Sequence, residues 1–210
     1  MASRTRTEKT EKLPLLGITM GDPARIGPEV IAKGLAGPKL KRLCFPLVIG
    51  SRSVMEQTIK KLKVKLEVRS VQGHEKLTPR AAQIALLDPL EKPLGPYRLG
   101  VAAPATGAAS VAFVKKAVHL ARIGCIDGMV TGPINKEAIN MAGCHFPGHT
   151  ELLADLTQTQ ESGMMIIGGP LKIMFATSHV ATKDLPSLLT QDKIEKAIRL
   201  AQLALTTLFG

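Results

Sequence analysis

Short apolar runs of strand length alternate with helical stretches along most of this chain, and this alternation limits the possible folds more than any other feature. The runs Leu15–Thr19, Leu43–Ile49 and Ile126–Thr131 each precede a segment with helical spacing or a helix-start signal. Such a pattern is typical of layered α/β proteins with a largely parallel sheet. With 210 residues, the chain can bury a substantial core. We therefore predict an α/β fold.

Capping residues mark several expected helix boundaries. The first helix is predicted to run to about Leu35, with Pro28 in its first turn and Asp22 or Gly27 as its cap. Three more N-caps are predicted, at Ser53, Asn135 and Thr190. The helix after Asn135 is expected to end at Gly143. The last helix is predicted to carry an apolar stripe made of Ile194, Ile198, Ala201, Leu205 and Leu208.

The middle of the chain gives a more mixed signal. Ser110–Ile123 is predicted to be a helix, because its apolar residues Val111, Val114, Val118 and Ala121 fall on one face. Met164–Ile167 and Leu171–Ala176 are predicted to pair as a hairpin around a Gly-Gly-Pro turn. The segment His74–Pro104 is rich in proline and glycine, so we interpret it as a long excursion or a domain crossing.

The net charge of +11 has several interpretations. Much of the excess lies in the first residues and in Lys60–Val68, where lysines alternate with apolar residues as in a strand with one solvated face. A nucleic-acid partner is the least favoured alternative, because one tyrosine, five phenylalanines and no tryptophan leave few platforms for base stacking. A basic cleft for an anionic metabolite is a further interpretation.

Three further features bear on the cellular compartment. No apolar run approaches the roughly 20 residues needed to cross a bilayer, so we expect no membrane association. The charged residues 1–14 are expected to form a disordered tail, and they lack the apolar stretch of a secretory signal. Cys44, Cys125 and Cys144 are widely spaced without a C-x-x-C motif, which favours neither disulfides nor zinc. These features predict a cytoplasmic protein.

Four motifs occur in a fixed order along the chain: Leu16–Glu29, Val130–Glu137, Phe146–Glu151 and Ala176–Val180. Together they resemble the 4-hydroxythreonine-4-phosphate dehydrogenase family of pyridoxal phosphate biosynthesis, from about Leu15 to Gly210. The resemblance implies the layered α/β/α fold of isocitrate and isopropylmalate dehydrogenases, with a cleft between two domains. It also implies a homodimer with a shared active site and a small phosphorylated substrate, with no nucleic-acid partner.

The family reaction is the oxidation of 4-phosphohydroxy-L-threonine, followed by decarboxylation to 3-amino-2-oxopropyl phosphate. The resemblance implies NAD or NADP as the hydride acceptor and one divalent metal, which is zinc, magnesium or cobalt. A divalent cation on the alcohol oxygen lowers its pKa and later polarises the ketone. The resemblance assigns no catalytic residue or cofactor-binding residue on this chain.

Three residues are candidates for the site. Taken alone, Thr150 is predicted to be an N-cap, with Glu151 as an acidic residue in the first helical turn. The resemblance implies that His149 and Thr150 bind substrate. A lone histidine after a strand is more often structural, but the resemblance implies that His179 is a metal ligand. Lys136 has two interpretations, a charge near the substrate or cofactor and a solvated lysine.

The chain departs from the family pattern at two places. Arg25 stands where the family usually has glycine, so the position either carries strain or adds a charge that binds substrate. The family also continues beyond the equivalent of Gly210, with two more metal-binding histidines. We therefore expect residues 15–210 to be the N-terminal portion of a two-domain dehydrogenase, incomplete for catalysis. The alternatives are a dehydrogenase of a sugar-acid phosphate or a cyclic diene-diol dicarboxylate, and a non-catalytic truncated partner subunit.

Overall fold

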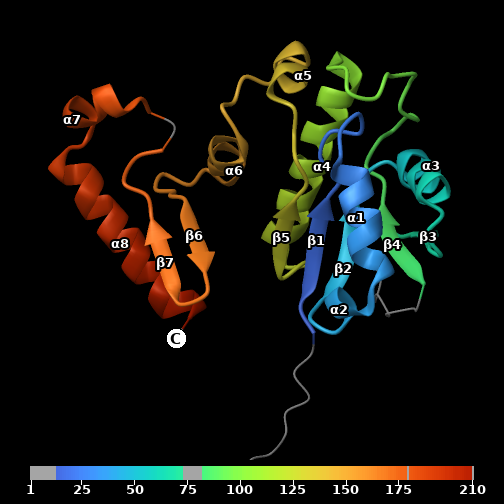
Figure 1. Cartoon of the computed structure of the whole chain (residues 1–210), viewed down its shortest axis with the longest axis horizontal. Helices are drawn as coiled ribbons and strands as arrows, with labels where there is room; N and C mark the ends of the chain where they lie inside the picture. The colour runs from blue at the N-terminus through green and yellow to red at the C-terminus, as the bar shows by residue number, and fades with distance from the viewer. Residues whose placement is uncertain (1–12, 73–81, 179, 210) are drawn as a thin grey trace, which may run out of the picture. The chain divides into compact units, whose positions relative to one another are not determined.

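The computed structural model describes residues 13–72, 82–178 and 180–209, and the chain forms two compact units, Met1–Pro147 and Gly148–Gly210 (Figure 1). Almost all of the predicted tail, residues 1–14, lies outside the described residues, as does His179. No helix in the described ranges is long and apolar enough to cross a membrane.

The first unit is built on a five-stranded sheet in the order β3-β4-β2-β1-β5, and every neighbouring pair is parallel. Its strands are β1 (Leu15–Thr19), β2 (Phe45–Ile49), β3 (Glu67–Ser70), β4 (Gln83–Leu87) and β5 (Gly128–Thr131). The predicted parallel sheet is therefore confirmed. The first strand has the predicted bounds, whereas β2 and β5 each begin two residues later than expected.

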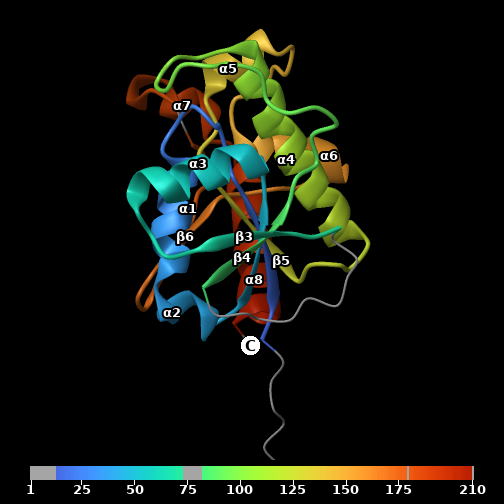
Figure 2. The same cartoon turned by 90° about the vertical axis from the view of Figure 1, so that its right-hand side faces the viewer.

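Helices cover both faces of this sheet, as Figure 2 shows, which gives the predicted layered arrangement. The helices of the first unit are α1 (Gly27–Ala36), α2 (Pro38–Lys41), α3 (Arg52–Leu62), α4 (Pro104–Arg122) and α5 (Lys136–Met141). The core combines strand residues such as Leu47 and Leu86 with helix residues such as Phe113, all fully buried. The predicted helical face of α4 is also confirmed, since Val114 and Val118 are buried.

The sequence prediction was wrong at two segments of this unit. Lys60–Val68 is not one strand, because its first residues end α3, and Lys63 then takes a left-handed conformation with φ of 53°. Val54 and Ile59 are buried on one face of α3, and this burial favours the helix over the strand that the alternating pattern predicts. The segment from His74 to Pro104 contains a strand that was not predicted, β4, whose buried apolar run has no period of two.

The predicted caps had mixed outcomes. Asn135 caps α5 and Thr190 caps the last helix, each accepting a hydrogen bond from a backbone N–H three residues later. Pro28 does lie in the first turn of α1, but the residue at the N-cap position is Ile26. The N-cap position of α3 is Ser51, two residues before the predicted Ser53, and its side chain makes no hydrogen bond to a backbone N–H of the helix.

The second unit contains a small antiparallel hairpin and several helices. Its elements are α6 (His149–Thr157), β6 (Met165–Gly168), β7 (Leu171–Met174), the 3-10 helix Thr182–Asp184, α7 (Leu185–Leu188) and α8 (Gln191–Leu208). The hairpin is confirmed, with Gly169 at φ of 54° in its turn. The stripe on α8 is not buried, since Ile198 is 61% exposed. Among the described residues of this unit, only Leu152 is a fully buried hydrophobic residue.

Candidate functional site

The carboxyl ends of β1 and β5 form the first candidate region. Strand β5 is at the edge of the sheet and β1 is its neighbour. The chain leaves β1 through α1 toward β2, while it enters β5 from α4. The strand order therefore reverses between them. In open α/β sheets, ligands bind in the crevice outside the carboxyl ends of strands at such a switch point.

Two glycines let the segments after β1 and β5 approach closely. Gly21 has φ of 73°, and a Cβ atom there would collide with the carbonyl oxygen of Pro133. A Cβ atom on Gly132 would lie 2.5 Å from the carbonyl oxygen of Thr19. The N–H of Asp22 donates to the carbonyl of Pro133 at 2.9 Å. Close backbone contact thus joins two of the sequence motifs, which lie more than a hundred residues apart.

Asp22 is a polar residue in this junction, and its sequence context predicts only a capping role. Its side chain is fully buried, and Oδ1 accepts a hydrogen bond from the N–H of Ala24 at 2.8 Å. The second oxygen, Oδ2, is buried without a partner. Burial raises the pKa of the nearby Tyr97 hydroxyl, and the negative charge of Asp22 raises it further. The only sequence signal for this residue was its place in a Gly-Asp-Pro turn after a strand.

Lys136 begins α5, next to the same edge of the sheet. Its side chain is exposed and makes no ion pair with any described residue. The helix itself is fixed against α4, because a Cβ atom on Gly107 would overlap the carbonyl oxygen of Ala138. Both interpretations of Lys136 therefore stay open.

His149 and Thr150 are the first two residues of α6, in the second unit. The predicted capping role of Thr150 is wrong, because Gly148 is the N-cap and Thr150 already lies inside the helix with its side chain exposed. Glu151 does lie in the first turn, as predicted. A glycine in extended conformation ends the preceding turn without needing a side-chain cap.

Of His149 and Thr150, only His149 is partly buried. It is half-buried, and its Nε2 atom is buried without a hydrogen-bond partner. Burial lowers the pKa of the imidazole, so the neutral form is favoured in the folded protein. A neutral imidazole carries one donor and one acceptor, and the unsatisfied nitrogen is suited to a polar ligand group.

The backbone conformation of Arg25 shows whether a side chain at this position strains the chain. It is not among the residues with positive φ, so the side chain that replaces glycine causes no left-handed backbone strain. The side chain is exposed and contributes to the wall of a pocket between α1 and α3. Of the two interpretations, the added charge therefore stays a prediction, whereas the strain is absent.

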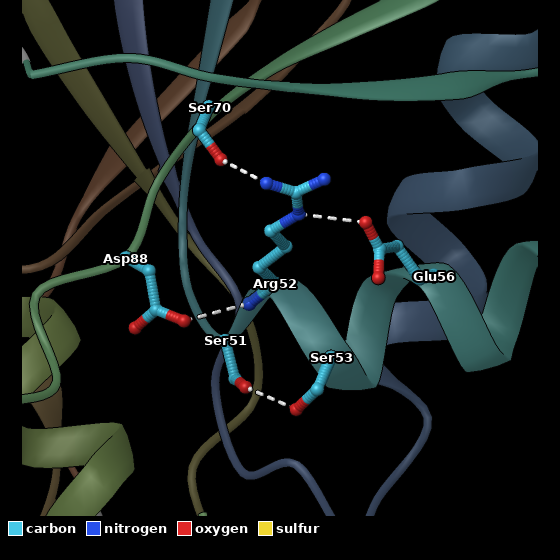
Figure 3. Close-up of polar contacts among 6 residues, drawn as sticks. All are labelled: Ser51, Arg52, Ser53, Glu56, Ser70 and Asp88. Carbon is cyan, nitrogen blue, oxygen red and sulfur yellow. Dashed lines mark hydrogen bonds and ion pairs between the residues drawn. The ribbon is translucent and has the colours of Figure 1, made fainter. Parts of the chain in front are cut away.

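A second polar cluster at the carboxyl ends of β2, β3 and β4 has a structural role (Figure 3). The Asp88 carboxylate accepts a hydrogen bond from the backbone N–H of Arg52 at 2.8 Å, which satisfies the start of α3. The guanidinium of Arg52 donates to Glu56 at 2.7 Å and to Ser70 at 3.0 Å. Because the drawn groups satisfy one another, this cluster fixes α3 to the sheet rather than offering a free site.

The described residues do not provide a divalent metal site. None of their His, Cys, Asp and Glu side chains form a group of three or more that could hold an ion. His179, the predicted ligand, lies outside the residues that the structure describes. A tightly held divalent ion needs at least three protein ligands, so this part of the chain does not fit such an ion by itself.

Comparison with known proteins gives a consistent result. A family model described as "Pyridoxal phosphate biosynthetic protein PdxA" matches residues 42–210. A 4-hydroxythreonine-4-phosphate dehydrogenase of Desulfosudis oleivorans is 41% identical over 94% of this chain. A putative D-threonate 4-phosphate dehydrogenase of Symbiobacterium thermophilum is 38% identical over 93% of the chain. The chain spans 58% of the length of each of these relatives.

Solved structures agree with this similarity. The crystal structure of a 4-hydroxythreonine-4-phosphate dehydrogenase from Klebsiella pneumoniae matches with a TM-score of 0.87 and 31% identity. The match covers 94% of this chain and 60% of that protein. The α/β fold described above is therefore the fold that these dehydrogenases share with isocitrate and isopropylmalate dehydrogenases.

Proposed function

Because the chain belongs to the PdxA family of pyridoxal phosphate biosynthetic proteins, we propose that it is part of a dehydrogenase of 4-phosphohydroxy-L-threonine. The alcohol carbon of the substrate gives hydride to NAD, and the resulting β-keto acid loses carbon dioxide to leave 3-amino-2-oxopropyl phosphate. Each turnover thus converts one substrate and one NAD into one amino ketone phosphate, one carbon dioxide and one NADH. The proposed enzyme acts in the cytoplasm.

His149 and Thr150 are the proposed substrate-binding residues. The observation that supports this most strongly is the buried Nε2 atom of His149, which has no partner in the described residues. A buried polar atom without a partner costs about 1–3 kcal/mol, and a substrate oxygen in hydrogen-bond contact would offset this cost. The exposed hydroxyl of Thr150, one residue later at the start of α6, offers a second hydrogen-bonding group.

The proposed cofactors are NAD or NADP and one divalent ion, which is zinc, magnesium or cobalt. Such an ion, when bound, supplies positive charge that stabilises an alkoxide. His179 stays the proposed metal ligand on this chain, while the described residues contain no group of three or more candidate ligands.

A homodimer with a shared active site is also proposed, and the second unit supports it. Exposed apolar side chains occur on both its hairpin and its long helix, including Ile166, Leu171, Ile198 and Leu208. Exposed apolar surfaces of this kind are one of the marks of protein–protein interfaces. A second copy of the chain would bury them.

Initial rates of NAD reduction test the proposed function. The assay uses the protein translated from the full reading frame that contains these residues, with 4-phosphohydroxy-L-threonine and D-threonate 4-phosphate as competing substrates. The proposal expects the first compound to give the higher kcat/KM. The variant His149→Asn is expected to lower kcat/KM about tenfold or more, by the loss of one hydrogen bond in a buried site.

Lys115→Gln is the matched control, because this exposed residue of α4 is not one of the proposed site residues. It should leave kcat/KM unchanged. Faster oxidation of D-threonate 4-phosphate would reassign the substrate to a sugar-acid phosphate. Unchanged kinetics in the His149 variant would remove this residue from the substrate site.

A further inference from the structure

A pocket of about 330 Å³ lies between α1 and α3 in the first unit. The two helices pack side by side on one face of the sheet (Figure 2). Part of the segment between β4 and α4 closes the pocket, and this segment is fixed to the turn after β1 by a hydrogen bond of 2.8 Å from the N–H of Gly100 to the carbonyl of Ala24. The volume is at the lower end of the range for small-molecule sites. Neither His149 nor Thr150, the proposed substrate-binding residues, lines it.

The charged residues of the wall leave one positive charge without a counterion. Lys61 and Glu29 neutralise each other, with 3.3 Å between Nζ and Oε1. Arg25 also lines the pocket, and its guanidinium makes no hydrogen bond or ion pair with any residue that the structure describes. Asp22 is not part of the wall. The pocket surface therefore has a formal charge of +1.

Two uncharged polar side chains in the wall also lack partners. The Gln57 amide and the Tyr97 hydroxyl make no side-chain hydrogen bond within the described part of the chain. An arginine fork, an amide N–H₂ and a phenol O–H are three donors that suit the oxygens of a phosphate group. Water can also hydrogen-bond to an amide and a phenol, so the fold around the pocket does not depend on a bound ligand.

The hydroxyls of Ser53 and Thr58 also line the pocket, but they are bonded to the Ser51 hydroxyl and the Val54 carbonyl, and the remaining wall is apolar. Pro23 and Pro28 come from the turn after β1 and from α1, whereas Leu94, Pro96 and Leu99 come from the covering segment. A bare inorganic anion would leave these carbon atoms in water. A small organic body attached to the anion would cover them, at a gain of roughly 25 cal/mol for each Å² of apolar surface.

We propose that the pocket between α1 and α3 binds a small organic phosphate monoester, with Arg25 as the counterion and Gln57 and Tyr97 as further donors. This site shares no lining residue with the proposed substrate contacts His149 and Thr150. Arg25 stands where glycine is usual in the family pattern, so the site is a property of this chain and of relatives that carry the same arginine.

The chain offers an internal probe of this pocket. Tyr97 is the only tyrosine, and there is no tryptophan. The tyrosine fluorescence of this 210-residue chain therefore reports on the pocket wall alone. Glycerol 3-phosphate is a suitable ligand for the titration, because it does not absorb where tyrosine does, and glycerol is its neutral control.

The 210-residue chain is titrated with glycerol 3-phosphate, glycerol and inorganic phosphate. We expect a saturable change of the fluorescence with glycerol 3-phosphate, at a Kd of about 1 mM or below. Glycerol should give no saturable change, and inorganic phosphate should bind more weakly than the ester. Equal curves for glycerol and glycerol 3-phosphate would overturn the proposal.

Two substitutions with opposite expected effects give the decisive comparison. Arg25→Gln removes the unpaired cation and should weaken binding about tenfold or more. Glu29→Gln removes the only acidic side chain of the wall and should tighten binding about threefold, because Lys61 is then free to attract the phosphate. Arg25 is exposed and Glu29 is partly exposed, so neither change should unfold the protein.

Arg122→Gln is the control, because it removes an exposed arginine at the end of α4 that does not line the pocket. Its Kd should equal that of the unmodified chain. If all three variants bind alike, the phosphate is not held by this wall and the proposal is wrong. Failure of this titration would leave the proposed dehydrogenase function intact, since that function depends on other residues.

Discussion

Buried polar atoms without partners are the most informative features at the scale of single residues. Asp22 at the end of β1 has one such oxygen, and His149 at the start of α6 has one such nitrogen. Each costs about 1–3 kcal/mol in the absence of a partner. Both residues belong to the four motifs that carry the family resemblance. Their environments, rather than their types, distinguish them from capping or solvated residues.

The pKa of His149 gives the first prediction at this scale. Burial should hold it below the ordinary value of about 6.5, so the imidazole stays neutral to lower pH in the folded protein than in the unfolded chain. The neutral group then contributes stability above the unfolded pKa. That stability should be lost as pH falls through the unfolded pKa toward the folded one, because only the unfolded chain binds the proton over this interval.

An NMR titration of the histidine ring protons measures this pKa. Urea unfolding at several pH values, compared with His149→Asn, measures the linked stability. The variant should show a weaker loss of stability on acidification. An ordinary or raised pKa for His149 would contradict its burial.

Asp22 gives the second prediction. Its negative charge raises the pKa of Tyr97, in addition to the larger effect of burial. Asp22→Asn removes the charge but keeps an oxygen that can accept from the N–H of Ala24. The pKa of Tyr97 should therefore fall, without returning to its ordinary value. The absorbance of the single tyrosine during a pH titration measures the change, and an identical curve for both proteins would show that the two groups do not interact.

Close backbone contact is the decisive feature at the scale of helices and strands. Gly21 and Gly132 allow the segments after β1 and β5 to meet, and Gly107 allows α4 to pack directly on α5. Each position leaves no room for a Cβ atom beside a carbonyl group. The carboxyl edge of the sheet is therefore shaped by glycines on elements far apart in the sequence.

A pair of glycine substitutions tests this packing. Gly107→Ala should reduce the free energy of unfolding by about 1–3 kcal/mol, because the methyl group collides with the backbone of α5. Gly34→Ala in α1 is the control, because the nearest atom to its Cβ would be Leu40 Cδ1 at 3.5 Å. There the better helix propensity of alanine should stabilise the protein by about 0.5–1 kcal/mol.

Urea unfolding of the two variants supplies both free energies. Equal effects of the two substitutions would mean that α4 and α5 are not in direct backbone contact.

The helix caps and strands also show which features can be predicted from the local sequence. The caps Asn135 and Thr190 can be predicted from the sequence, because each side chain accepts a hydrogen bond from a backbone N–H only three residues later, within the helix that it begins. The prediction of Ser53 as the cap of α3 is wrong because the side chain that accepts a hydrogen bond from the first helical N–H, that of Arg52, belongs to Asp88, 36 residues away. No local pattern reports such a contact. β4 was missed for a related reason, since a strand buried on both faces loses the alternation that identifies half-buried strands.

At the scale of the whole molecule, the two units differ in how much apolar surface they bury. The first has a continuous core around its sheet, whereas the described residues of the second contain one fully buried hydrophobic side chain, Leu152. The sequence predicted the apolar stripe of α8 but could not show that it stays exposed, because exposure depends on which other elements cover it. Likewise, the motifs named the candidate residues, but the contact between the turns after β1 and β5 is visible only in the fold.

The exposed stripe gives a prediction about association. If a second copy covers it, sedimentation equilibrium should show a dimer, and Ile198→Gln should weaken the dimer by about tenfold, from the loss of a buried apolar side chain. Lys193→Gln near the start of the same helix is the control, and it should leave the association unchanged. A monomer at all concentrations, or equal dimer stability in both variants, would remove the proposed dimer surface from α8.

The most direct measurement of the central proposal is the stoichiometry of the reaction catalysed by the protein from the full reading frame. Carbon dioxide, NADH and phosphorylated product are counted after a known amount of 4-phosphohydroxy-L-threonine is consumed. Oxidation followed by decarboxylation predicts equal amounts of all three. NADH without carbon dioxide, or no NADH from this substrate at all, would contradict the proposed function.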